Sequence, residues 1–184
     1  MSRTPSQLRL QFFMVAATIV LFVAALAINE LLFTRSEFAR GINWIYLPAG
    51  VRLLSTLLFG GAGAIGLLLV SWAVSFFYFF PDDLVRAFMG GILASLAPYL
   101  VYRIMQRHWG LKETLANLTT RRLLLCSLLY ALASPALHHL WFAFADPGRA
   151  LLPGFIVMAT GDFTGTILVL YAAKLVLPRR RLPH

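Results

Sequence analysis

The sequence has little charge for its length. Only 12% of its 184 residues are Asp, Glu, Lys or Arg, whereas 60% are hydrophobic, and the mean hydropathy is +0.79. Soluble domains carry about twice that share of charged residues. The composition therefore excludes a soluble domain and predicts an integral membrane protein that is embedded in the lipid bilayer.

Cysteine and catalytic motifs are also scarce. The single cysteine, Cys126, lies in an apolar run, so no disulfide can form within the chain, and we interpret it as a buried, inert thiol. The sequence has no Gly-x-Ser-x-Gly elbow, no His-Glu-x-x-His pair and no phosphate-binding loop. We therefore expect no enzyme activity, no metal site and no cofactor.

Acidic residues are fewer than basic ones. The chain has 7 Asp and Glu against 16 Lys and Arg, which gives a formal net charge of +9. In a soluble protein this excess would suggest nucleic acid as a partner, but here the cations cluster at the ends of apolar runs. We interpret them as signals of membrane topology and expect no nucleic-acid partner.

Apolar runs divide the chain into six predicted helices. A membrane-spanning helix needs about 20 mostly apolar residues, and six runs of roughly that length are joined by connections that are short except for 106–121. We predict an all-α polytopic membrane protein in which residues 1–184 form one domain. The second run is the weakest, because it is short and contains Pro48 and Arg52, and it could be tilted or broken. The predicted helices cover residues 10–33, 43–60, 62–80, 84–105, 122–144 and 153–177.

The distribution of Lys and Arg over the predicted loops favours an even number of crossings. With both termini cytoplasmic, eleven basic residues fall on the inner side and three on the outer side, which is the bias that membrane proteins show. We therefore predict that both termini are cytoplasmic. The inner set is Arg3, Arg9, Arg103, Arg107, Lys112, Arg121, Arg122, Lys174, Arg179, Arg180 and Arg181, and the outer set is Arg35, Arg40 and Arg149.

Ionisable residues inside the predicted spans mark a candidate site. Arg52 and Asp162 each lie about two turns from the outer end of a helix, and Glu30, His138 and His139 also fall in the outer half. A charge in hydrocarbon is costly unless it is paired or hydrated. We predict an outward-open ligand pocket in which Arg52 holds an anionic group and Asp162 an amine or a proton. The alternative is a polar network that only fixes helix packing.

The two adjacent histidines are unsuited to one metal ion. Neighbouring side chains on a helix point about 100° apart, whereas a helical ligand pair is normally three or four residues apart. We expect one of His138 and His139 to face the polar interior and the other a helix interface. Beside Asp162, the pair Gly161-x-x-x-Gly165 predicts close approach of a neighbouring helix.

Two motifs resemble a known membrane domain. Leu47-Pro48-Ala49-Gly50, followed by an apolar run, resembles the Pro-Ala-Gly signature of MASE1, a bacterial membrane-embedded sensory domain, and Gly161-Asp162-Phe163-Thr164-Gly165 resembles the Gly-Asp-x-x-Gly helix near the end of that domain. The resemblance implies a sensory module of the bacterial inner membrane. MASE1 domains are usually joined to an output domain. The sequence printed here ends at His184 without one, so we expect output through another membrane or signalling protein.

A second resemblance ranks behind the first. The segments Gly60–Gly66, Phe80-Pro81 and Ala87–Gly91 are similar to those of substrate-binding S-components of energy-coupling-factor vitamin transporters. Our expectation is thus a non-enzymatic ligand-binding or sensory module that recognises a small molecule or lipid from the periplasmic side and acts through a partner. The alternatives are a transporter S-component and an accessory subunit of a membrane complex.

Overall fold

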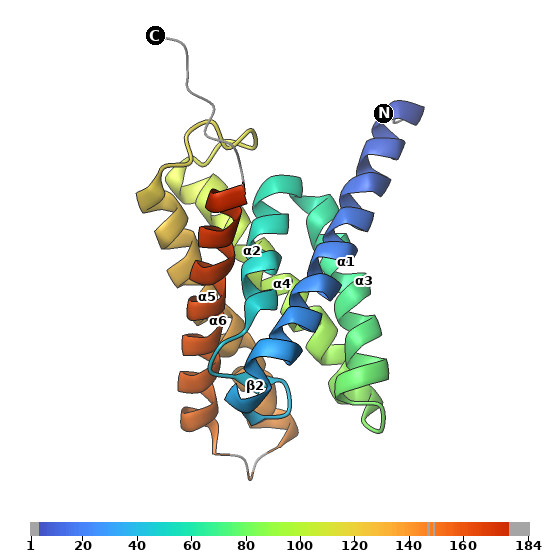
Figure 1. Ribbon diagram of the computed structural model, residues 1–184, viewed down its shortest axis with the longest axis vertical. Coiled ribbons are helices and arrows are strands. Elements are labelled where there is room, and N and C mark those ends of the chain that lie inside the picture. Colours follow the sequence, from blue (N-terminus) through green and yellow to red (C-terminus); the bar gives the residue numbers. More distant parts are fainter. Residues whose placement is uncertain (1–3, 147, 149, 177–184) are drawn as a thin grey trace.

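The computed structural model describes residues 4–146, 148 and 150–176. Within them the chain forms six α-helices, a short antiparallel β-hairpin, a 3₁₀ turn and a π-helical turn (Figure 1). The elements are α1 (Pro5–Phe33), η1 (Thr34–Ser36), β1 (Glu37–Ala39), β2 (Ile42–Asn43), α2 (Leu47–Phe59), α3 (Gly61–Val74), η2 (Ser75–Phe79), α4 (Leu84–Trp109), α5 (Thr120–Ala145) and α6 (Leu151–Val176).

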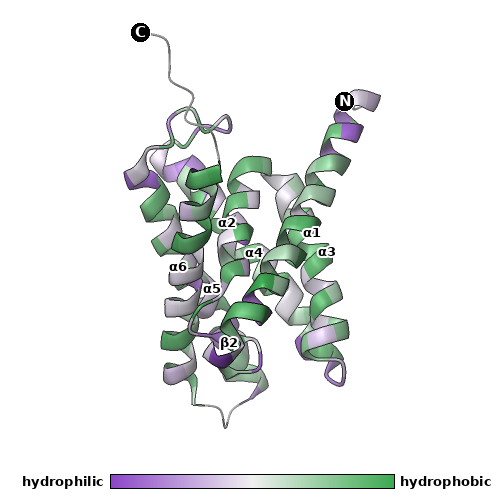
Figure 2. Ribbon diagram, viewed as in Figure 1, coloured by the Kyte–Doolittle hydropathy of each residue, from purple (hydrophilic) through white to green (hydrophobic). Residues whose placement is uncertain are grey.

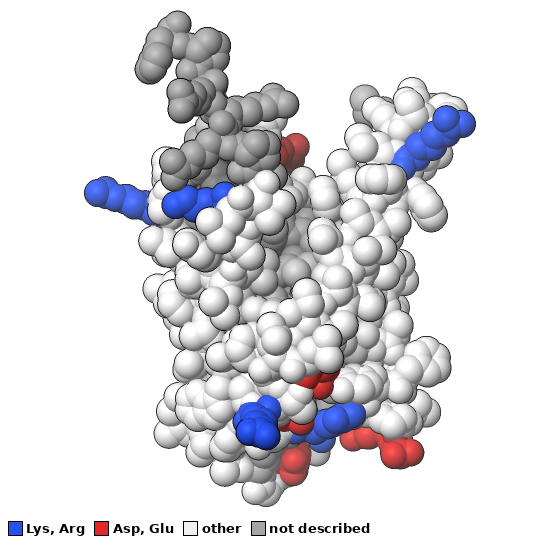
Figure 3. Space-filling view, in the orientation of Figure 1, with Lys and Arg blue, Asp and Glu red and all other residues white. Residues whose placement is uncertain are grey.

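Five of the helical segments in the described part of the chain are long and apolar enough to cross a membrane. The exception is α2, which has 13 residues. Apolar residues cover most of the surface of the bundle, and charged residues gather at its two ends (Figures 2 and 3). These features are consistent with the predicted all-α polytopic membrane protein. Six complete crossings remain a prediction, because α2 is short.

The two ends of the bundle differ in what they carry. One end, the hairpin end, holds β1, β2 and the turn between η2 and α4; the other, the loop end, holds the connection 110–119 between α4 and α5 (Figure 1). Helix α1 begins and α6 finishes at the loop end, as an even number of crossings requires. Of the residues used for the charge count, Arg3, Arg149, Arg179, Arg180 and Arg181 lie outside the described residues.

The predicted second helix starts four residues too early. Residues 43–46 are not helical: Ile42 and Asn43 pair with β1, and the Trp44 amide donates to the carbonyl oxygen of Ser36. The helix begins at Leu47, with Pro48 in its first turn, where the missing amide hydrogen costs nothing. The other predicted helices are present with shifted ends, and the third finishes as the π-helical turn η2. Position 177 of the predicted sixth helix lies outside the described residues.

Helix α2 forms the centre of the bundle. It packs against all five other helices, and nine of its 13 residues are buried. It turns directly into α3 at Gly60, whose φ of +54° belongs to the left-handed region that favours glycine. Gly60 therefore permits the tight reversal between the two helices. As a result, Arg52 is held in the protein interior and does not face lipid.

The Gly161-x-x-x-Gly165 pair accommodates the non-helical segment that leads into α2 and the first residue of that helix, so the predicted close approach of a neighbouring helix is confirmed at Gly165. A Cβ at Gly161 would collide with the carbonyl oxygen of Asn43, and one at Gly165 with that of Tyr46. The amide of Tyr46 donates to the carbonyl oxygen of Gly161 at 3.2 Å. Non-helical backbone at membrane depth is tolerated only where protein covers it, and the glycine groove of α6 supplies that cover.

Candidate functional site

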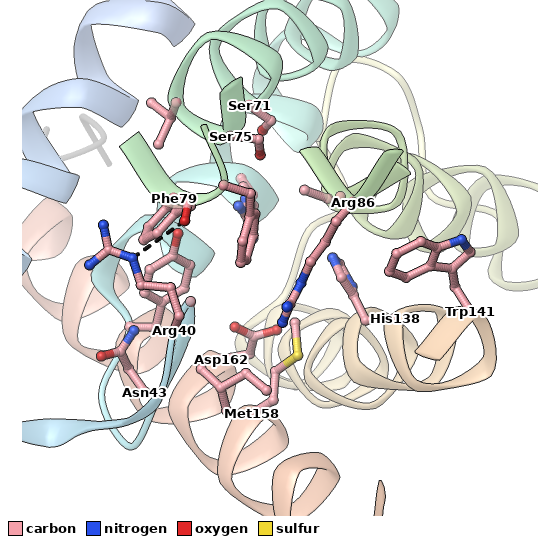
Figure 4. Close-up of a pocket in the computed structure, with 18 of the residues that line it drawn as sticks. Arg40, Asn43, Ser71, Ser75, Phe79, Arg86, His138, Trp141, Met158 and Asp162 are labelled. Carbon is pink, nitrogen blue, oxygen red and sulfur yellow. Dashed lines mark hydrogen bonds between the residues drawn. The ribbon is translucent and has the colours of Figure 1, made fainter. Parts of the chain in front are cut away.

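Arg52 and Asp162 line the same cavity. The cavity has a volume of about 70 Å³, room for a few water molecules or one small polar group (Figure 4). All six helices and the hairpin contribute residues to its lining. His138 lines it as well. Asp162 stands near the middle of α6, deeper than the predicted two turns, because α6 begins before residue 153. The two residues, 110 positions apart in the sequence, thus lie on one cavity.

Arg52 is enclosed by aromatic rings. Its side chain is 7% exposed, and its guanidinium carbon lies 5.3 Å from the ring centroids of both Phe22 and Tyr46. Rings that cover the faces of a guanidinium leave the N–H groups at its edge to bind other partners. The guanidinium interacts electrostatically with Tyr46, Tyr130 and Asp162, yet its Nε finds no hydrogen-bond partner among the described residues.

Asp162 is more completely buried than Arg52. Its side chain is 1% exposed, and the polar groups that act on its carboxylate are Arg52 and the hydroxyl of Ser134. Within the described residues its Oδ2 has no hydrogen-bond partner, and no ion pair joins it to Arg52. The two charges therefore face one cavity without direct contact. A cavity between them is the arrangement that a ligand pocket requires.

The two histidines point to different places, as expected for neighbours on a helix. His138 lines the cavity, and its Nδ1 lies 2.8 Å from the carbonyl oxygen of Ser134. His139 packs between α5 and α6, where its Nε2 would be 2.9 Å from a Cβ at Gly154, and its ring meets Phe155 edge to face. Among the described residues, no three His, Cys, Asp or Glu side chains gather as a metal-binding set.

Glu30 lies apart from the cavity. It is half-buried, and its Oε2 accepts a hydrogen bond from the Tyr78 hydroxyl at 3.1 Å, while the lining residues do not include it. The sequence placed Glu30 at the right depth but could not show its direction, since depth along a helix does not fix the face. Its neighbour Asn29 points inward instead and accepts a hydrogen bond from the Leu47 amide.

Two further arginines line the cavity and were missed as site residues. Arg40 was assigned to an outer loop, and Arg86 was not considered. Arg40 donates to the carbonyl oxygens of Tyr78 at 2.8 Å and Phe79 at 3.4 Å, and Arg86 lies over the ring of Phe80 at 4.3 Å. The aromatic run 76–80 was the available signal, since such rings stack on guanidinium groups.

The charged residues that line the cavity are mostly cationic. Figure 4 shows Asp162, His138 and Arg86 projecting from three helices toward the same space, with Arg40 at the hairpin side. Three arginines against one aspartate make the cavity attractive to an anion. Ser71, from α3, adds a buried hydroxyl that has no hydrogen-bond partner among the described residues.

Comparisons of the chain with protein-family models, with curated proteins and with solved structures find no match. The resemblances to MASE1 and to S-components therefore stay predictions that depend on the motifs alone.

Proposed function

We propose that this protein is a non-enzymatic ligand-binding module of the bacterial inner membrane, which recognises a small molecule or lipid headgroup from the periplasmic side and acts through a partner protein. The observation that carries the proposal is the placement of Arg52 and Asp162 on one cavity without a direct ion pair. The MASE1-like motifs support it, because each of the two residues lies in or just after one of them.

A purely structural role explains the geometry less well. Charges that fix helix packing stabilise a fold when they contact each other and their hydrogen bonds are satisfied, because desolvation otherwise exceeds the attraction. Here Arg52 Nε and Asp162 Oδ2 both have unused hydrogen-bonding capacity at a cavity. A ligand, or water that a ligand displaces, would satisfy these atoms.

Native mass spectrometry of the protein released from nanodiscs tests the proposal. We expect a bound non-protein mass that is lost in Arg52→Gln and Asp162→Asn. It should be retained in the control Arg121→Gln, whose side chain is exposed at the loop end. If the wild-type protein carries no such mass and its stability responds to no small molecule or lipid, the cavity holds only water and the structural alternative is correct.

The periplasmic direction is tested by cysteine labelling. In a Cys126→Ala background, we expect a membrane-impermeant maleimide to label Asp82→Cys in intact cells and Glu113→Cys only after the membrane is opened, since both positions are exposed, at the hairpin end and the loop end respectively. The opposite labelling would place the cavity toward the cytoplasm.

A further inference from the structure

We propose that the cavity binds a small zwitterion, with an oxyanion held by Arg52 and an ammonium group held by Asp162. This inference rests on the proposed ligand-binding function and names the chemical class of the ligand. It starts from two opposite charges that are fixed on different helices, are buried to 93% and 99%, and do not touch. A molecule with one charge of each sign would complete both.

The oxyanion end follows from the way Arg52 is held. The ring centroids of Phe22 and Tyr46 each lie 5.3 Å from the guanidinium carbon of Arg52. The N–H donors in the plane of the guanidinium group therefore remain available to a ligand. A planar fork of N–H donors matches a carboxylate or phosphate in bidentate geometry. Nε is one of these donors, and it has no hydrogen-bond partner among the described residues. Arg86 and Arg40 line the same cavity and add favourable charge for the anion.

The ammonium end follows from Asp162. A carboxylate oxygen only accepts hydrogen bonds, so the unpartnered Oδ2 calls for a donor from the ligand. Two buried hydroxyls, Ser134 and Thr166, lie on α5 and α6, the helices that carry His138 and Asp162. An ammonium group has three donors, and neutral ligand ends have fewer.

The size of the cavity limits the separation of the two charges. A cavity of about 70 Å³ favours a small ligand with its two charges close together, such as a small amino acid or an ethanolamine phosphate. The ammonium-and-oxyanion chemistry has two sources that the structure treats alike: a free amino acid and the headgroup of phosphatidylethanolamine. The experiment separates them.

Thermal unfolding of the purified protein in detergent tests the class. The zwitterionic probes are glycine, β-alanine and O-phosphoethanolamine, and the matched single-charge probes are acetate, methyl phosphate and ethylamine. We expect at least one zwitterion to raise the unfolding temperature with an apparent affinity about tenfold or more above its single-charge analogues, since each analogue leaves one buried charge unsatisfied. Phosphatidylethanolamine retained in native mass spectrometry, with no response to glycine or β-alanine, would assign the lipid source.

Variants distinguish recognition of both charges from a general effect on folding. Asp162→Asn should cut the affinity for the zwitterion about tenfold while leaving the affinity for acetate or methyl phosphate unchanged. Arg52→Lys should keep the charge but weaken binding, because the planar fork is lost. Ser71→Ala changes a cavity residue outside the charged pair. If Asp162→Asn or Arg52→Lys does not fold, this variant and the ratio of the wild-type affinities for zwitterionic and single-charge probes still test the proposal.

Three results would contradict the proposal in different ways. Equal affinity for acetate and glycine would show an anion site, so the zwitterion class would be wrong while the ligand-binding function stood. Preference for ethylamine would show a cation site, so the zwitterion class would again be wrong while the ligand-binding function stood. No response to any probe, together with no bound mass from the membrane, would overturn both the ligand class and the proposed function.

Discussion

The hairpin end and the loop end of the bundle differ in how regular their backbone is. At the loop end the helices finish with ordinary caps: Gly110, in the left-handed region, follows α4, and the Thr119 side chain accepts from the Arg122 amide at the start of α5. At the hairpin end the regular structure is interrupted by a β-hairpin and the π-helical turn η2. Interruptions of helices are common at functional sites.

The arginines differ as well. Arg121 at the loop end is exposed, and such a charge is hydrated and costs little, whereas Arg52 is buried beside Asp162. The positive-inside bias accounts for cations like Arg121. The positive-inside bias does not explain a buried cation such as Arg52. The comparison therefore separates charges that set topology from charges that require a specific partner.

The largest loss of stability is expected at Gly165, where the backbone of the segment before α2 contacts α6 directly. A side chain at Gly165 would collide with the carbonyl oxygen of Tyr46, which is backbone and cannot move away without lifting α2 off α6. We predict that Gly165→Leu yields no folded protein and that Gly165→Ala loses about 3 kcal/mol or more, measured by thermal or denaturant unfolding in detergent.

Gly61 is the matched control. It lies in the first turn of α3, and a Cβ there would meet nothing within 4 Å. Gly61→Ala should therefore leave the stability unchanged or raise it slightly, by about 0.5 kcal/mol. Equal loss in both variants would mean that the hairpin segment does not lie in the groove of α6.

The sequence pointed to six helices and to Arg52 and Asp162 as cavity residues, because both inferences depend on local signals. Long apolar runs set the helices, and a charge inside such a run is conspicuous whatever the fold. The non-helical segment before Leu47 was missed for a physical reason: Trp44 and Tyr46 leave the helical conformation through hydrogen bonds to Ser36 and Gly161, partners that only the tertiary fold supplies.

The second largest effect is expected for the buried charges. Removing either partner leaves the other uncompensated, so Arg52→Met and Asp162→Leu should each cost about 3–5 kcal/mol. The double variant should cost less than the sum, with a coupling of about 0.5–3 kcal/mol in a double-mutant cycle. Pairing Asp162→Leu with Arg121→Gln should give additive losses. Single losses below about 1 kcal/mol would indicate that water in the cavity hydrates both charges.

The other residues that line the cavity were harder to predict from the sequence than Arg52 and Asp162. Glu30 lies at a depth similar to that of the other predicted residues, yet it faces Tyr78. Arg40 comes from the hairpin and Arg86 from the start of α4, and both line the cavity. A sequence gives the depth of a residue in a span. The direction of its side chain depends on how each helix is rotated in the bundle.

The smallest loss of stability is expected for asparagine substitutions, which can be compared at the two ends of the bundle. Asn29, 1% exposed, accepts a hydrogen bond from the Leu47 amide at 2.8 Å, and Asn117 at the loop end accepts from the Lys112 amide at 3.0 Å. Asn29→Ala leaves a buried N–H at the start of α2 without a partner, so we expect a loss of about 1–3 kcal/mol.

The same substitution at Asn117 should cost less, about 0.5–1.5 kcal/mol, because that residue is only half-buried and water can replace its hydrogen bonds. Unfolding of the two variants in the same detergent, scanned in parallel, gives the difference directly. A larger loss for Asn117→Ala than for Asn29→Ala would show that water reaches the start of α2. The cavity around Arg52 would then be a hydrated channel, and the buried charges would need no ligand to complete them.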